Sequence, residues 1–188
     1  MPLKPPLETE RLLLREFVED DVEAFYRLGT DPEITRYTGD GGGMKSLDNA
    51  LAILRAYPLA DYQKYGYGRW ACVLKSTGHV IGFAGLKYLD DLKEVDVGYR
   101  LFPAHWGSGL ATEASRAAVQ YGFDTLRLQE IIGLVDPQNS ASVRVLQKLG
   151  LTFVAMIEYR TYHVARYLIG KDTFHRLRLR ACETTGER

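Results

Sequence analysis

Two glycines, Gly107 and Gly109, are the residues of this sequence whose type and spacing point most directly to chemistry. Apolar residues alternate with other residues over 95–101, which is the period-two pattern of a strand. Apolar residues then recur at helical spacing over 110–123. A glycine turn between such a strand and helix leaves the first backbone N–H groups of the helix free, at the positive end of its dipole. This pattern predicts a phosphate site.

Two common phosphate loops do not fit this turn. A nucleotide-triphosphate loop would have Lys-Ser or Lys-Thr after its glycines, and no such pair follows here. A dinucleotide-binding loop would have a third glycine at position 112, where this chain has Thr112. On pattern alone, a phosphate site and a plain tight turn both remain open.

Three sequence blocks carry a resemblance to a known family. Residues 106–114 read Trp-Gly-Ser-Gly-Leu-Ala-Thr-Glu-Ala, residues 139–142 form an Asn-x-x-Ser motif, and residues 9–15 read Thr-Glu-Arg-Leu-Leu-Leu-Arg. In this order and spacing they resemble the GCN5-related N-acetyltransferases, most closely the branch of ribosomal-protein N-terminal acetyltransferases. The resemblance runs from residue 9 to about residue 170. It implies an enzyme that moves an acetyl group from acetyl-CoA to a primary amine.

The resemblance also implies a cofactor site. The diphosphate of acetyl-CoA would bind the N–H groups of the glycine turn, and Gly98 would form a bulge that parts its strand from the next to admit the pantetheine arm. Trp106 stands where the family usually has Gln or Arg, and Ser108 where a cation is frequent, so backbone N–H groups are expected to dominate phosphate binding. The expected cofactor-binding residues are Tyr99, Arg100, Leu101, Trp106, Gly107, Ser108, Gly109, Leu110, Ala111, Thr112 and Asn139.

Acetyl transfer by direct attack requires a neutral amine, a donor for the thioester oxygen and a proton for the leaving thiolate, with no metal and no covalent intermediate. Asp96 is the expected base, because it aligns with an acid that the branch commonly carries as Glu. Its alternative role is a satisfied polar side chain on a sheet face. Glu94 is the second candidate for the base and is expected in the preceding loop.

The Asn-x-x-Ser block supplies the other expected catalytic residues, Asn139 and Ser142. Asn139 would contact the cofactor or position water, although simple helix capping also explains it. Ser142 would protonate or hydrogen-bond the thiolate. The family often has a catalytic tyrosine on this helix, and its absence here leaves Ser142, Tyr99 or water as the proton donor.

The composition of the chain argues against several classes of protein. The 188 residues carry 24 basic and 24 acidic side chains, and this balance argues against a general nucleic-acid binder. Cys72 and Cys182 are too few for a disulfide framework, and no signal peptide or long apolar run occurs, so a cytoplasmic protein off the membrane is expected. Four scattered histidines form no metal motif. The expected partners are acetyl-CoA and an amine acceptor, either a protein N-terminus or a small amine such as a polyamine, amino acid or antibiotic. The expected assembly is a monomer or a homodimer. A non-catalytic acyl-CoA sensor and a nucleotide-binding domain are competing functions.

The expected fold is α/β, with a mixed, mostly antiparallel central sheet, helices on both faces and one splayed pair of parallel strands. A single domain is expected over 1–188, with a core over about 9–170 and a charged, fraying tail over 171–188. Residues 29–37 are expected to be irregular, and residues 39–43 to form a substrate lid or a solvated loop. The aromatic-rich residues 57–70 would pack the core, line an amine pocket or form a dimer contact, and packing is favoured. The expected strands are 11–15, 70–74, 80–88, 95–101, 131–135, 151–159 and 162–169, and the expected helices are 22–28, 46–60, 110–123 and 139–149.

Overall fold

The structure, a computed structural model, describes residues 7–38 and 43–185, with side chains up to residue 180. Eight strands form one sheet in the order β1-β2-β3-β4-β5-β6-β8-β7, and every neighbouring pair is antiparallel except β5 and β6. The predicted mixed, mostly antiparallel sheet is therefore confirmed. The strands are β1 (Leu7–Glu8), β2 (Leu12–Arg15), β3 (Arg69–Leu74), β4 (Val80–Leu89), β5 (Glu94–Leu101), β6 (Glu130–Val135), β7 (Thr152–Tyr159) and β8 (Tyr162–Gly170).

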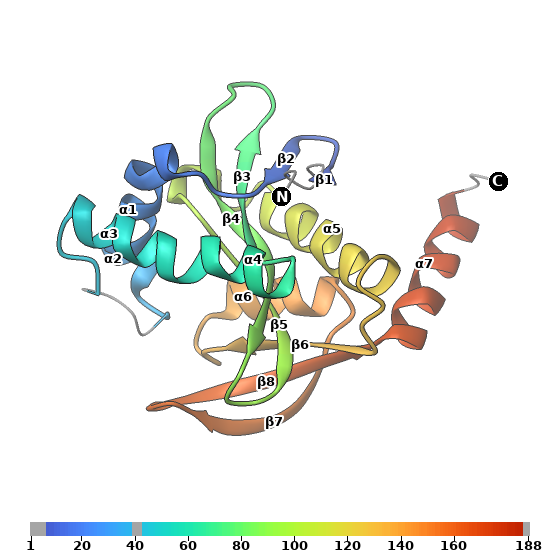
Figure 1. The fold of residues 1–188 in the computed structure, drawn as a ribbon. Coiled ribbons are helices and arrows are strands. Elements are labelled where there is room, and N and C mark those ends of the chain that lie inside the picture. Colours follow the sequence, from blue (N-terminus) through green and yellow to red (C-terminus); the bar gives the residue numbers. More distant parts are fainter. Residues whose placement is uncertain (1–6, 39–42, 186–188) are drawn as a thin grey trace.

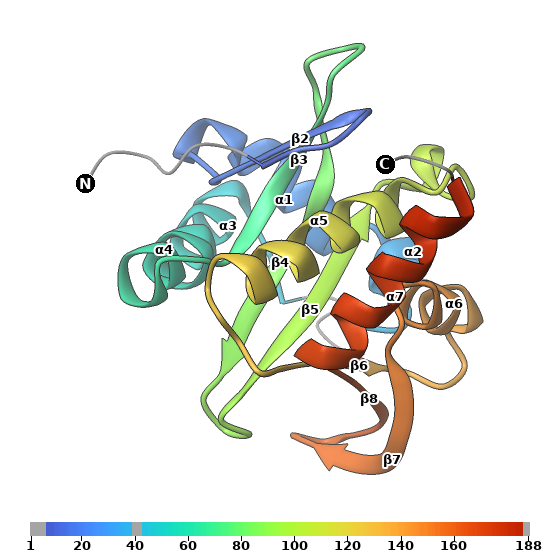
Figure 2. The same cartoon turned by 90° about the vertical axis from the view of Figure 1, so that its right-hand side faces the viewer.

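Helices cover both faces of this sheet. One layer contains α1 (Val22–Thr30), α2 (Pro32–Thr35), α3 (Leu47–Leu54) and α4 (Ala60–Tyr65), and the other contains α5 (Leu110–Asp124) and α6 (Ser140–Lys148) (Figures 1 and 2). Short 3₁₀ turns precede α1 and α5 at Glu19–Asp21 and Pro103–His105. Among the described residues, no helix is long and apolar enough to cross a bilayer.

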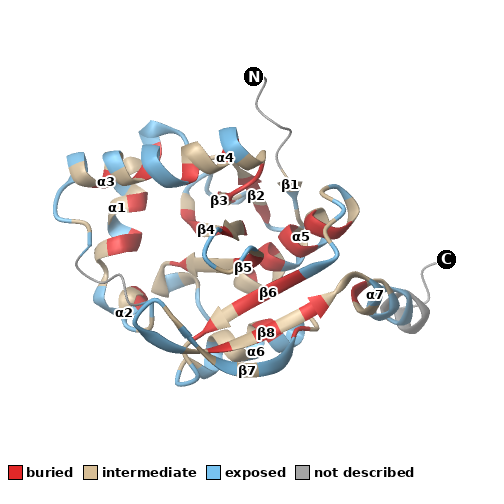
Figure 3. Cartoon of the chain, turned by 60° about the horizontal axis from the view of Figure 1, so that its bottom comes forward, coloured by how far each residue is buried: buried red, intermediate tan, exposed pale blue. Residues whose placement is uncertain are grey.

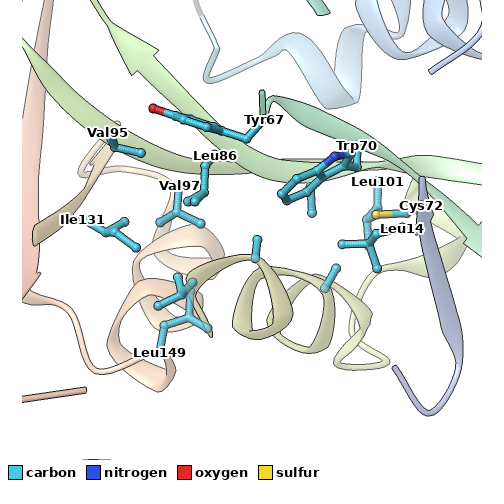
Figure 4. Close-up of a cluster of buried hydrophobic side chains, with 14 of the residues drawn as sticks. Leu14, Tyr67, Trp70, Cys72, Leu86, Val95, Val97, Leu101, Ile131 and Leu149 are labelled. Atoms are coloured by element: carbon cyan, nitrogen blue, oxygen red, sulfur yellow. The ribbon is translucent and has the colours of Figure 1, made fainter. Parts of the chain in front are cut away.

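The core between the sheet and α5 follows from strand alternation. Val97 and Leu101 of β5, Leu86 of β4 and Trp70 of β3 point toward α5 in one cluster (Figure 4). Because side chains alternate between faces, Asp96, Gly98 and Arg100 lie on the face of α1 to α4. The edge strand β7 is largely exposed, whereas β6 beyond its first residue is mostly buried (Figure 3).

The first helical layer is longer than the sequence predicted. The segment expected to be irregular contains the end of α1 and all of α2, because Asp31 caps α2 by accepting the N–H groups of Glu33 (2.9 Å) and Ile34 (3.3 Å). The helix expected to end at residue 60 continues through a π-helical turn at Arg55–Leu59, which accommodates Pro58, and ends at Gly66 in a left-handed conformation. The predicted lid at 39–43 lies outside the described residues, except for Gly43.

The aromatic-rich stretch contributes mainly to packing. Tyr62, Tyr67 and Trp70 are buried, and Trp70 meets Tyr121 of α5 edge-on at 5.3 Å between ring centroids. Tyr57, in contrast, is 55% exposed. Three of these rings therefore support the layers on the two sides of the sheet.

The expectation that the tail would fray from Lys171 is wrong, because this segment forms α7 (Lys171–Thr185). Phe174 is 5% exposed and its ring lies 4.9 Å from that of Phe123 in α5. Arg178 also donates to Asp124 at 2.8 Å. One buried aromatic side chain and one ion pair thus attach a helix whose charged sequence suggested a solvated end.

Candidate active site

The parallel strands β5 and β6 form a fork. In the described chain they pair at one position, Asp96 opposite Ile132, and then run on to Leu101 and Val135 without further pairing. The N–H of Phe102 donates to the carbonyl of Ile81, so even-numbered positions of β5 direct their backbone groups toward β4 and odd-numbered positions toward β6. The N–H and C=O of Tyr99 therefore face the open fork.

Asp96 occupies the point where the strands part. In a continued parallel ladder, the N–H of Leu134 would bond the carbonyl of Val97. It donates instead to Oδ1 of Asp96 at 3.1 Å, which leaves the Val97 carbonyl facing the fork. Asp96 is 7% exposed and its other oxygen accepts from Arg69. Burial raises the pKa of Asp96, and the Arg69 guanidinium and the Leu134 N–H oppose that rise.

Gly98 is required for a different reason from the one expected. Its pairing with β4 is regular, Gly85 opposite Gly98, so the predicted bulge is absent from this ladder. A Cβ at Gly98 would lie 2.4 Å from Nη2 and 2.6 Å from Cζ of Arg69. Glycine is needed here because the guanidinium that holds Asp96 lies directly on the Gly98 backbone.

Glu94 was expected in the loop before β5, but it is the first residue of β5. Its carboxylate pairs with Arg166 of β8, whose Nε lies 3.2 Å from Oε2. On the same face, Asp61 of α4 pairs with Lys87 at 3.4 Å. The acids Asp61, Glu94 and Asp96 therefore each have a basic partner.

The far end of the fork is bridged by two hydroxyls. Tyr99 points to the α6 side, where its hydroxyl lies 2.7 Å from that of Ser142 and donates to the Ser142 carbonyl at 3.0 Å. Burial raises the pKa of Tyr99 to about 12, more than the Ser142 hydrogen bond lowers it, so the phenol stays protonated. Asn139 caps α6 and accepts the N–H of Ser142 at 3.0 Å. The structure thus brings Tyr99, Ser142 and Asn139 together.

The glycine turn ends at a helix start without a side-chain cap. Gly109 is the N-cap residue of α5 with φ +84°, whereas Ser46 and Asn139 cap α3 and α6 with side-chain oxygens. The first bond into this helix joins the Glu113 N–H to the Gly109 carbonyl at 3.0 Å. Within the described structure, the N–H groups of residues 107–112 have no protein acceptor, and residues 106–109 are exposed. This is the arrangement that binds an anion.

Side chains in and near the turn donate to nearby carbonyls and leave the N–H groups of the turn free. The Trp106 indole donates to the Leu101 carbonyl and the Ser108 hydroxyl to the His105 carbonyl, both at 2.7 Å. Arg11 of the β1–β2 turn donates through Nη1 to the Ser108 carbonyl at 2.9 Å. Each of these bonds satisfies a carbonyl in or beside the turn and uses none of the N–H groups of residues 107–112.

Other predicted cofactor residues contribute backbone more readily than side chain. Leu110 is buried in the core, and Ala111 and Thr112 lie half-buried in the first turn of α5. The Arg100 guanidinium lies on the opposite face, where Nη1 donates to the Leu28 carbonyl at 3.2 Å. The Leu101 carbonyl already accepts from Trp106.

Sequence reasoning missed three site residues, Arg69, Arg11 and Glu113. Arg69 reaches Asp96 from β3, two strands away in the sheet, and Arg11 reaches the turn from the first hairpin. For Arg11 and Glu113 a signal existed, since both belong to the motif blocks at 9–15 and 106–114. Nothing in the local pattern around Arg69 indicates its partner.

Comparisons with known proteins show the family of this chain. The acetyltransferase (GNAT) domain model matches residues 11–152. The uncharacterized N-acetyltransferase YoaA of Bacillus subtilis is 35% identical over 147 residues, which are 78% of this chain and 82% of YoaA. The chain therefore belongs to the GNAT acetyltransferase family, and it is an acetyl-CoA-dependent N-acetyltransferase.

Two solved structures show the same fold. An acetyltransferase from Agrobacterium tumefaciens has a TM-score of 0.76 at 28% identity, over 88% of this chain and 94% of that one. The ribosomal L7/L12 α-N-protein acetyltransferase RimL, in complex with coenzyme A, has a TM-score of 0.77 at 16% identity, over 89% and 99% of the two chains.

Proposed function

We propose that this enzyme acetylates the α-amino group of a polypeptide N-terminus by direct attack on acetyl-CoA held in the β5–β6 fork. The observation that carries the proposal is the fork itself, with unpaired backbone groups of Val97 and Tyr99 along one side. The pantetheine amides would bond these groups as a strand would. The diphosphate would bind the free N–H groups of residues 107–112, and residues 9–170 would form the catalytic core.

The basicity of Asp96 supports this class of acceptor. Burial raises the pKa of Asp96, but a carboxylate is still a much weaker base than an alkylamine, and it would take the amine proton through a bridging water. An α-amino group has a pKa of about 8 and is partly neutral at physiological pH, whereas an alkylamine near ~10.4 is almost fully charged. A weak base therefore suits an α-amino group. The resemblance of residues 9–15 and Trp106 to the ribosomal-protein branch supports the same acceptor.

The leaving thiolate would take its proton from the hydroxyl pair Tyr99–Ser142 at the end of the fork. In the balanced step, the amine nitrogen forms a bond to the carbonyl carbon and the C–S bond breaks. The ammonium proton passes through water to Asp96, and the sulfur receives a proton from the hydroxyl pair. The pair then regains a proton from solvent as Asp96 releases its proton to solvent. Asn139 would hold Ser142 in position through its N–H.

A thiol-release assay over matched acceptors tests this function. The panel contains a lysine-free peptide with a free N-terminus, the same peptide N-acetylated with one lysine added, spermidine and an aminoglycoside. We expect the highest kcat/KM with the free N-terminus. A clear preference for spermidine or the aminoglycoside would contradict the acceptor and favour a small amine. Coenzyme A binding without acceptor-dependent thiol release would favour the sensor function.

We further propose that the protein works in the cytoplasm, which the buried free thiol of Cys72 supports, since a reducing compartment keeps such thiols unpaired.

A further inference from the structure

We propose that Arg11 and Glu113 form a clamp that sets the phosphate-binding conformation of the turn 106–111. Neither residue is expected to touch the cofactor, so both act as positioning residues. This inference rests on the proposed coenzyme A site. The turn has no basic side chain of its own, and the clamp would hold it in the conformation that binds a diphosphate.

The clamp joins residues that are 102 positions apart in the sequence. Arg11 donates through Nε to Oε2 of Glu113 at 2.7 Å and through its backbone N–H to Oε1 at 2.8 Å. Thr9 donates its hydroxyl to the same Oε1 at 2.6 Å. The Arg11 carbonyl accepts the N–H of Lys75, the residue that follows β3, at 3.0 Å, and this bond also holds the hairpin turn that carries Arg11.

Another nitrogen of the guanidinium bonds directly to the turn. Arg11 Nη1 holds the Ser108 carbonyl at 2.9 Å. In a trans peptide the C=O and the following N–H point in opposite directions. Turning the Ser108 carbonyl toward the hairpin therefore turns the Gly109 N–H to the other, exposed side of the turn. The two flanking glycines, with φ of +74° and +84°, make this peptide easy to rotate, so it needs an external hold.

The clamp also pairs the negative charge of Glu113. Glu113 lies in the first turn of α5, where an unpaired carboxylate would repel a diphosphate and compete for the helix dipole. Bonds from Thr9 and Arg11 engage both of its oxygens, on the side of the hairpin. Removing Arg11 would therefore both release the Ser108 carbonyl and leave a negative charge at the phosphate site.

Two acetyl donors separate this role from general stability. Acetyl-CoA carries the diphosphate, and S-acetylpantetheine does not. In Arg11→Met we expect KM for acetyl-CoA to rise roughly tenfold or more, with kcat at saturation close to wild type, because a charge-assisted hydrogen bond is worth that much. The rate with S-acetylpantetheine should not change. Arg11→Lys should recover part of the loss, and adding Glu113→Gln to Arg11→Met should recover part by removing the repulsion.

Arg55→Met is the matched control, because Arg55 makes a similar exposed bidentate pair with Glu19, at 2.7 Å for both bonds, far from the turn along the chain. Its KM for acetyl-CoA should match wild type. An unchanged KM in Arg11→Met, or an equal loss with both donors, would overturn the clamp. If wild type itself failed to bind coenzyme A by calorimetry, the proposed function would fail, which is a distinct result.

Discussion

The hydroxyl of Tyr99 lies 2.7 Å from the hydroxyl of Ser142 and joins the two arms of the fork. Tyr99 belongs to β5, and Ser142 belongs to α6, the helix that follows β6. In the proposed mechanism, this pair would donate the proton to the thiolate from across the gap in which the thioester would lie. Each hydroxyl belongs to one arm only, so the bridge needs both of them.

Tyr99→Phe should lower kcat by roughly 10- to 100-fold and leave the affinity for coenzyme A nearly unchanged, because it removes an acid and no backbone group. Ser142→Ala should act similarly, and the double variant should lose little more, since the two hydroxyls form one unit. Tyr121→Phe is the control, a half-buried tyrosine packed against Trp70. Steady-state kinetics with wild-type kcat in Tyr99→Phe would remove the phenol from the mechanism.

Asp96→Asn should reduce kcat/KM by about 100-fold, because an amide cannot accept the amine proton. The acidic limb of the wild-type pH–rate profile should disappear in this variant. The variant should also be less stable by about 3 kcal/mol, since Arg69 loses its buried partner. Full activity in Asp96→Asn, with folding verified by circular dichroism, would mean that Asp96 serves only to terminate the strand ladder.

Gly98→Ala should displace Arg69 and cost about 1–3 kcal/mol of unfolding free energy, as overpacking does. Combining it with Arg69→Ala should cost less than the sum of the two single changes. Gly78→Ala serves as the control, because its added Cβ meets no atom within 4 Å and only backbone strain at φ +73° remains. Additive costs in denaturant titrations of the four proteins would disprove this steric contact.

The sequence predicted local features well and long-range pairs poorly. The strand, glycine turn and helix over 95–123 follow from hydrophobic period and glycine placement, which neighbouring residues determine. Asn139 and Ser142 likewise lie three positions apart on one helix start. Their partners, however, come from other elements. Arg69 meets Asp96 only after β3, β4 and β5 are in register, and no pattern within a strand encodes that meeting.

The C-terminal segment failed as a prediction for a similar reason. Its charged sequence has low hydrophobicity, and its attachment depends on the contact of Phe174 with Phe123 and on the ion pair of Arg178 with Asp124. Tertiary packing decides the state of such a segment, and its own composition does not.

Phe174→Ala should therefore destabilise the protein by about 3–5 kcal/mol, the cost of emptying an aromatic site in the core. Leu179→Ala, on the exposed side of the same helix, should cost less than about 0.5 kcal/mol, since Leu179 is 65% exposed. Thermal unfolding of both variants measures the difference. Equal costs would show that α7 is not anchored through Phe174.

The clamp predicts an acid sensitivity. Burial raises the pKa of Glu113, but hydrogen bonds from Thr9 and Arg11 outweigh that effect and leave it below its ordinary value of 4.5. Stabilisation by this carboxylate is therefore complete above that value and is lost as pH falls through the lower folded value. Between about pH 6 and pH 3, the melting temperature should fall more steeply in wild type than in Glu113→Gln. Parallel curves would show that the carboxylate contributes nothing to stability.

A crystal structure of the protein with coenzyme A is the most direct measurement of the central claim. We predict the diphosphate within hydrogen-bonding distance of the N–H groups of residues 107–112 and the pantetheine amides bonded to Val97 and Tyr99 in the β5–β6 fork. Coenzyme A bound elsewhere, or bound at the turn with its pantetheine arm outside the fork, would contradict the account.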